Sequence, residues 1–351
     1  GRLERALARF AREVEMQILP DGGHVERSPK AQLLALRYLI DARDALRTAQ
    51  HDVPAEVMGA IDRAAPLVRF FRHGDDCFAL FNGADEGDPD RIELVLNRAE
   101  AKGKPPASAP YTGFQRLLAG RSLILMDAGP PAPAGLDRDA HAGTLSFEMS
   151  IGKERLFVNC GGYRGPSLDW RITARATAAH STVIVADTNS SEVWPAGGLG
   201  RRPIDVICER AEDQGSQWIE ASHDGYEKVF GLVHSRQLFL AGDGEDLRGE
   251  DRLKGPAGQG FSIRFHLHPD VQVSLIQEGA SALLRLTGGS GWRLRVQGAV
   301  MSIGESVYLG GETLRKTRQI VLDGHVGSGG ATVRWALKRE KKPGDGNKGN
   351  G

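Results

Sequence analysis

The sequence contains no long apolar run, no excess of charge of either sign and no closely spaced pair of cysteines. Its apolar stretches are shorter than the roughly 18 residues that a membrane span needs, so we expect no membrane insertion. Lys plus Arg and Asp plus Glu number 45 each, which leaves no net charge to attract nucleic acid. Cys77, Cys160 and Cys208 lie far apart, which argues against a disulfide framework or a cysteine zinc site. An anion site is therefore expected to be local.

The N-terminal residues have the pattern of an amphipathic helix. Apolar residues recur every three or four positions over residues 2–19, and Pro20, Asp21 and Gly22 end the pattern. Charges run through residues 1–20, unlike a signal peptide. No capping signal precedes the helix, so we expect a helical part upstream of residue 1.

Three further helices are predicted at 29–49, 54–72 and 89–101. Ser28 is placed to cap the first of them, with Pro29 at its first helical position. Short loops join these helices, as in a stack of helical hairpins. We therefore assign residues 1–110 to a helical segment.

From about Tyr111 the period changes from helix to strand. Residues 144–151, TLSFEMSI, alternate apolar with polar side chains, which is typical of a half-buried strand. The same alternation recurs in six later segments: 181–187, 235–242, 261–268, 281–287, 291–297 and 331–338. Gly- and Asp-rich turns separate them, so residues 111–340 are predicted to form a large antiparallel β-sandwich. The charged, Gly-rich residues 341–351 are predicted to be a disordered tail.

Several motifs, in order, resemble those of the bacterial heparinase II/III-like polysaccharide lyases. They are LPDGGHVERSP (19–29), HAGTLSFEMSIGKERLFVNCGG (141–162), RATAAHSTVIVADTNSSEVW (175–194) and FSIRFHLHP (261–269). The resemblance implies the end of an incomplete (α/α) toroid followed by an antiparallel β-sandwich. It also implies β-elimination of an acidic polysaccharide in the cleft between them, with no required cofactor. The sequence leaves the compartment open between the periplasm and the cytoplasm of a bacterium.

The chain departs from the family at the residues that the family lyases use for catalysis. Family lyases pair an Asn-His in an earlier toroid helix with a Tyr just after the GGHxExSP loop. The Asn-His would lie before residue 1, and Ala31 stands at the Tyr position. Because an alanine cannot transfer a proton, either another group has taken the role or the chemistry differs.

His24 and Glu26 follow Gly22 and Gly23, whose backbone freedom can leave the side chains facing a groove. A histidine can act as a base near neutral pH, and a carboxylate can orient it or supply a proton. The alternative is an ordinary turn before a helix.

Arg175 and His180 form the second candidate pair. His180 immediately precedes the β-rich segment that starts at Val183, and the resemblance places it in the active site. Arg175 could neutralise the substrate carboxylate, which lowers the cost of the enolate-like intermediate. The alternative for His180 is a core histidine at a strand end.

Four further residues are candidates for contact with substrate. Tyr163 and Arg164 could replace the missing phenol and add a cation, although a tyrosine in a Gly-rich turn is more often a surface residue. Asn189 and Trp194 follow the His180 strand, where the indole could stack on a sugar ring or plug the end of the sandwich.

His73 lies in a mixed-charge loop after the third helix, 69–76, and is an alternative proton carrier. The simpler interpretation is a solvated helix end, where Arg and His favour the helix dipole.

A structural divalent metal in the β-domain is a further possibility. His266 and His268 alternate along one strand and could bind a metal if Asp187, His234 or His141 faced them. An exposed polar face of the sheet is the simpler interpretation.

Three functions follow. The first is a lyase in which His24, Glu26, Arg175 and His180 surround the scissile bond. The second is a glycoside hydrolase that uses carboxylates such as Glu26 and Glu148. The third is a non-catalytic carbohydrate-binding or scaffold protein that has lost the Tyr.

Overall fold

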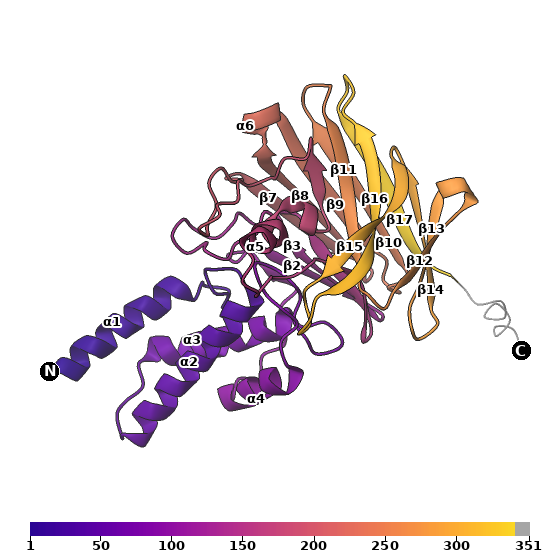
Figure 1. The fold of residues 1–351 in the computed structure, drawn as a ribbon. Helices are drawn as coiled ribbons and strands as arrows, with labels where there is room; N and C mark the ends of the chain where they lie inside the picture. Colours follow the sequence, from indigo (N-terminus) through magenta and orange to yellow (C-terminus); the bar gives the residue numbers. More distant parts are fainter. Residues whose placement is uncertain (341–351) are drawn as a thin grey trace, which may run out of the picture.

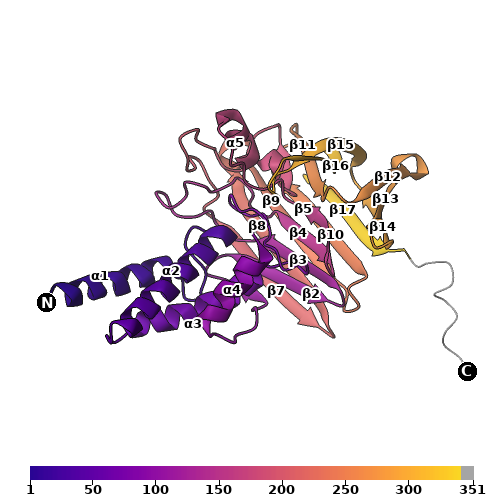
Figure 2. The same ribbon diagram turned by 60° about the horizontal axis from the view of Figure 1, so that its bottom comes forward.

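The computed structural model describes residues 1–340, and the predicted tail at 341–351 lies outside the described residues. Helices come first, and two β-sheets stacked face to face follow (Figure 1). The helices lie together at one end of the sandwich (Figure 2). Within residues 1–340 no helix is long and apolar enough to cross a membrane.

The four predicted helices are confirmed, each ending within a few residues of the expected position. They are α1 (Arg2–Gln17), α2 (Pro29–Thr48), α3 (Ala55–Phe70) and α4 (Pro89–Ala99). Pro29 occupies the first position of α2 after Ser28, although the Ser28 side chain makes no capping hydrogen bond. The buried faces of the helices form one apolar cluster.

The first sheet has nine strands, all paired antiparallel. Its order is β1-β2-β3-β4-β5-β11-β16-β15, with β6 also paired to β11. The bounds are β1 (Ser108–Ala109), β2 (Phe114–Ala119), β3 (Ser122–Asp127), β4 (Phe147–Ile151), β5 (Glu154–Val158), β6 (Val183–Val185), β11 (Gly260–Leu267), β15 (Val300–Tyr308) and β16 (Arg315–His325).

The second sheet has eight antiparallel strands in the order β12-β13-β14-β17-β10-β9-β8-β7. The bounds are β7 (Val206–Asp213), β8 (Ser216–Tyr226), β9 (Leu232–Leu240), β10 (Asp246–Lys254), β12 (Gln272–Ile276), β13 (Ser281–Arg285), β14 (Gly291–Gln297) and β17 (Ala331–Arg339). Two short helices, α5 (Leu168–Arg175) and α6 (Glu227–Phe230), lie between strands.

The core of the sandwich lies between the inner faces of the two sheets. Phe147 of β4 stacks on Trp335 of β17 with ring centroids 5.8 Å apart, and Phe265 of β11 meets the same indole edge-on at 5.0 Å. The predicted fold class, helices followed by a large antiparallel sandwich, is confirmed.

Two strand predictions need correction. The segment at 144–151 was expected to be half-buried, but every residue of β4 is buried because the loop after α3 covers its polar face. The strand expected at 181–187 is only three residues long, since Ala186 and Asp187 adopt positive φ angles of 45° and 50° and turn the chain away.

The helical segment and the first sheet are packed into each other. Phe114 of β2 meets Phe71 at 4.9 Å and Phe81 at 5.2 Å between ring centroids. The buried guanidinium of Arg27 donates to the Thr112 carbonyl at 2.6 Å and pairs with Asp127. These contacts fix the start of α2 against the loops that carry the candidate residues.

Candidate functional site

A cavity of about 120 Å³ lies between the start of α2 and the loops before β4. Its lining residues are Glu26, Ser28, Lys30, Ala31, Leu34, Asn82, Gly83, Leu136, Asp139 and Ala140. Helical and sheet parts thus both contribute to it. This cavity is the candidate cleft.

Glu26 faces the cavity, whereas His24 does not line it. Burial, followed by the negative charge of Asp139, raises the pKa of the Glu26 carboxyl. His24 is buried; its Nε2 lies 3.3 Å from Gln17 Oε1, and its Nδ1 accepts the Glu26 backbone N–H. Burial also lowers the pKa of His24. Of the predicted pair, only Glu26 is placed to meet a ligand here.

His180 and His141 form a hydrogen-bonded pair beside the cavity. His180 Nδ1 donates to the Ala176 carbonyl at 2.8 Å, which leaves His180 Nε2 as an acceptor. His141 Nδ1 lies 3.0 Å from that nitrogen and therefore donates to it. By elimination, His141 Nε2 carries a lone pair.

The free nitrogen of His141 lies next to the cavity wall. A Cβ atom placed on Gly83, which lines the cavity, would be 3.8 Å from His141 Nε2. Within residues 1–340 no hydrogen-bond partner is found for this atom. Burial lowers the pKa of His141 well below its usual value and that of His180 to about 4, so both rings are neutral at pH 7.

Arg175 holds loops together. Its guanidinium donates to the backbone carbonyls of Ala140 at 2.9 Å, Trp194 at 3.0 Å and Gly198 at 2.7 Å. Each of its three nitrogens makes one of these bonds. The bonds give Arg175 a positioning role for the loop that carries His141, and Arg175 does not line the cavity.

The four predicted substrate-binding residues near the β-sheet loops do not line the cavity. Tyr163 stacks on Trp170 with ring centroids 5.8 Å apart, and Arg164 pairs with Asp85. Asn189 Oδ1 accepts the Thr177 backbone N–H at 2.9 Å. Trp194 is half exposed and borders a separate hollow.

His73 does not lie at a solvated helix end. Its ring is buried and lies 3.0 Å from Glu148 Oε2 and 2.9 Å from Ser150 Oγ. Burial lowers its pKa against the opposing effect of Glu148. The other oxygen of Glu148 accepts the backbone N–H groups of Leu80 and Asn159. Because Glu148 is fully buried, the hydrolase pair Glu26 and Glu148 is not assembled in the cavity.

Two of the residues considered for a metal site, His266 and His234, are bonded elsewhere. His266 is buried, not on an exposed face, and lies 2.7 Å from Ser306 Oγ and 2.9 Å from the Ala178 carbonyl. His234 lies 2.9 Å from Asp251 in the second sheet. No group of three or more His, Cys, Asp or Glu within residues 1–340 is arranged to hold a metal ion.

Sequence reasoning missed Asn82 and Asp139 and considered His141 only as a metal ligand. Asn82 donates to the Arg27 carbonyl at 2.9 Å and accepts the His141 backbone N–H at 3.1 Å, so it joins the two halves of the site. A usable signal was the HAG motif: a Cβ atom on Gly143 would lie 2.7 Å from His180 Cδ2, so glycine makes room for that ring.

Residues 101–336 match the family model described as heparinase II/III-like, C-terminal. The chain belongs to the heparinase II/III-like family. FtsZ-localized protein C of Caulobacter vibrioides is 33% identical over 356 residues, covering 96% of this chain and 61% of that protein.

Solved structures of heparinase III and of a heparan sulfate lyase share the fold. A heparinase III structure superposes with a TM-score of 0.80 at 16% identity, covering 97% of this chain and 56% of that one. A mutant of the heparan sulfate lyase HepC from Pedobacter heparinus gives 0.78 at 15% identity, covering 98% and 58%. At these identities the likeness shows the fold alone. The chain spans between 56% and 61% of the length of these three proteins.

Proposed function

We propose that this chain binds an acidic, uronic-acid-containing polysaccharide at the cavity beside α2 and cleaves it by β-elimination. The observation that supports this most strongly is the free lone pair of His141 Nε2 at the cavity wall, held in that tautomer by His180 and the Ala176 carbonyl. A base with a fixed lone pair is what removal of the proton next to the substrate carboxylate needs.

The cavity offers groups for the rest of the reaction. In the elimination, the base removes the C5 proton, a double bond forms between C4 and C5, and the C4 oxygen leaves with its electron pair and gains a proton. Lys30 is a cation on the cavity wall and can pair with the uronate carboxylate. Glu26, whose pKa is raised, can hold a proton for the departing oxygen. Ala31, which stands where the family has its Tyr, cannot donate a proton.

The test is the ultraviolet absorbance of the unsaturated product on heparan sulfate, alginate and other uronans. We expect absorbance to rise with at least one of them, and His141→Gln to abolish the rise. A broad uronan panel without any signal would overturn the lyase proposal, and a saturated product would point to hydrolysis.

A second candidate is a non-catalytic protein that binds a glycan and localises with FtsZ. Two observations favour it: Ala31 replaces the family Tyr, and the 33% identical relative is named for its localisation with FtsZ. Co-sedimentation with FtsZ filaments, together with glycan binding and no turnover, would support this candidate. Turnover without co-sedimentation would reject it.

A further inference from the structure

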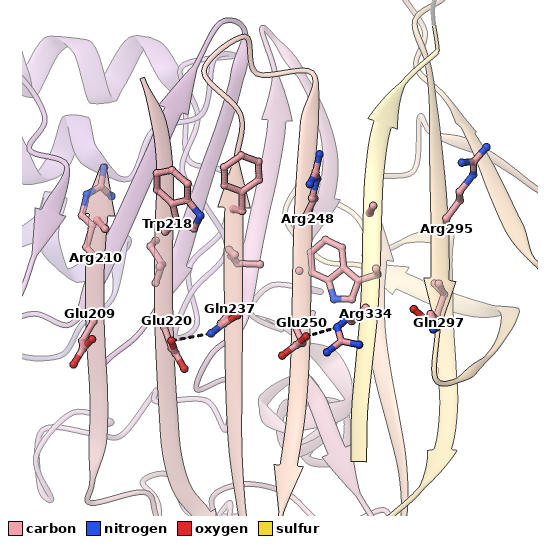
Figure 3. Close-up of a pocket in the computed structure, with 18 residues that line it drawn as sticks. Glu209, Arg210, Trp218, Glu220, Gln237, Arg248, Glu250, Arg295, Gln297 and Arg334 are labelled. Carbon is pink, nitrogen blue, oxygen red and sulfur yellow. Dashed lines mark hydrogen bonds and ion pairs between the residues drawn. The ribbon is translucent and has the colours of Figure 1, made fainter. Parts of the chain in front are cut away.

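A large groove crosses the outer face of the second sheet, on the opposite side of that sheet from the sandwich core. It encloses about 880 Å³ over strands β7, β8, β9, β10, β17 and β14 (Figure 3). Neighbouring strands lie about 4.8 Å apart, so six strands span about 24 Å. Nothing in the proposed lyase chemistry uses this surface.

The outward side chains form two rows that follow the strand register. We call the first the ring row; its members are direct cross-strand neighbours: Ala211, Trp218, Phe239, Arg248, Ala336 and Arg295. We call the second the polar row, built in the same way: Glu209, Glu220, Gln237, Glu250, Arg334 and Gln297. Figure 3 shows the polar row below the labelled Trp218 and Arg248.

The ring row provides one apolar platform. The Trp218 and Phe239 rings lie 5.0 Å apart between centroids, and Arg248 sits 5.4 Å above the Phe239 ring. Trp218 is 39% exposed although indole surface is costly to leave in water. Ala211 and Ala336 have small side chains, so the surface of the row is lower at these two positions than at the rings and Arg295.

The charges of the groove are largely neutralised within the sheet. The two rows contain three glutamates and three arginines. Arg248 pairs with Asp246 at 2.7 Å, and Arg334 pairs with Glu250. Gln237 donates to Glu220 at 2.8 Å. Of the three arginines, only Arg295 has no ion-pair partner within residues 1–340, so the surface offers little attraction to a polyanion.

We propose that this groove binds an uncharged glycan chain laid across the strands. The C–H face of a pyranose ring can pack on the Trp218 and Phe239 platform. Its hydroxyl groups can donate to the glutamates and accept from the amide and guanidinium groups of the polar row. A protein partner would need an interface whose centre is more apolar and holds less water than two aromatic rings among ion pairs.

Calorimetric titration of the whole chain with cellohexaose and chitohexaose tests the proposal. We expect at least one oligosaccharide to bind with an affinity that does not change with salt concentration. Trp218→Ala should weaken binding about tenfold, which corresponds to ~1.4 kcal/mol, and Gln237→Ala should weaken it less. Tyr38→Ala removes another exposed ring, from α2, and should have no effect.

Three results would overturn the proposal. One is no binding of either hexasaccharide at millimolar concentration. Another is salt-sensitive binding of heparin that Trp218→Ala or Arg295→Ala abolishes, because the groove would then be a polyanion site. The third is a change of oligomeric state in Trp218→Ala, which would make the groove an interface between copies. Lyase turnover on a short uronan is measured separately, so failure of either proposal leaves the other standing.

Discussion

Two histidine pairs in this molecule have nearly the same geometry and different surroundings. His141 Nδ1 lies 3.0 Å from His180 Nε2, and His234 Nδ1 lies 3.2 Å from His223 Nε2. In both pairs the rings meet edge to face. All four rings are buried, and burial lowers the pKa of each. The pairs differ in the hydrogen-bond partners of their outer ring nitrogens, the ones that do not join the two rings.

The pair at His223 and His234 is closed at both ends. His234 Nε2 donates to Asp251 at 2.9 Å, and the Gly225 backbone N–H donates to His223 Nδ1 at 3.0 Å. The pair at His180 and His141 is closed only by the Ala176 carbonyl. A buried histidine pair therefore does not by itself indicate a catalytic site. The two pairs differ in that His141 Nε2 has no hydrogen-bond partner within residues 1–340.

The largest expected effect comes from the anchor of the closed pair. Asp251 also accepts from Arg236 Nε at 2.7 Å and from the Trp335 indole at 3.0 Å. Asp251→Ala leaves the fully buried Arg236 without its counter-charge, so we expect a loss of about 3–5 kcal/mol in unfolding free energy. Urea unfolding measures it. Asp270→Ala, which breaks an exposed pair with Arg315, should cost no more than about 1 kcal/mol; equal losses would contradict the contrast.

The next effect separates the two pairs by activity. His141→Gln should lower the rate of unsaturated-product formation at least about a hundredfold, the usual contribution of a positioned base. His223→Gln should lower stability yet leave the rate per folded molecule unchanged. Turnover normalised to the folded fraction is the measurement, and equal rate losses in both variants would remove the distinction.

A smaller effect is the pH dependence of stability. The folded-state pKa of His180 is lowered to about 4 and that of His266 to about 3, both mainly by burial. The unfolded chain binds protons first as the pH falls below about 6.5, so stability is fully present above that pH and declines towards 4. Each histidine contributes roughly 1 kcal/mol per pH unit in this window. Unfolding curves at several pH values measure the slope, which His180→Gln should reduce; a flat profile from pH 7 to 4 would contradict the buried, neutral assignment.

The sequence predicted the helices well because their apolar periods and breakers are local signals. The second sheet was harder: β7 and β8 were missed, since their outward face mixes Glu209 and Glu220 with the apolar Ala211 and Trp218, which breaks the alternation. β3, Ser122–Asp127, is buried on both faces, so its apolar run shows no alternation. The number of strands therefore could not be predicted from local sequence patterns, because it depends on contacts between distant segments.

The site was only partly predictable for the same reason. Glu26 and His180 stand out in motifs, and both lie at or beside the cavity. The roles of Arg175 and His73 could not be inferred, because they depend on carbonyls and a carboxylate brought in from distant segments. The role proposed for His141 follows from the tautomer of His180, which depends on the position of the Ala176 carbonyl.

Beneath the helices, the domain defined by the family model and the packed apolar unit have different boundaries. The family model begins at residue 101, yet Phe114, Leu123 and Leu125 belong to the same apolar cluster as Phe71 and Phe81, which follow α3. A segment cut at residue 101 would expose that part of β2 and β3 to water. The unit matched by the family model is thus smaller than the unit that shares this apolar cluster. In this chain, a replacement helical part would have to match the apolar residues on these two strands.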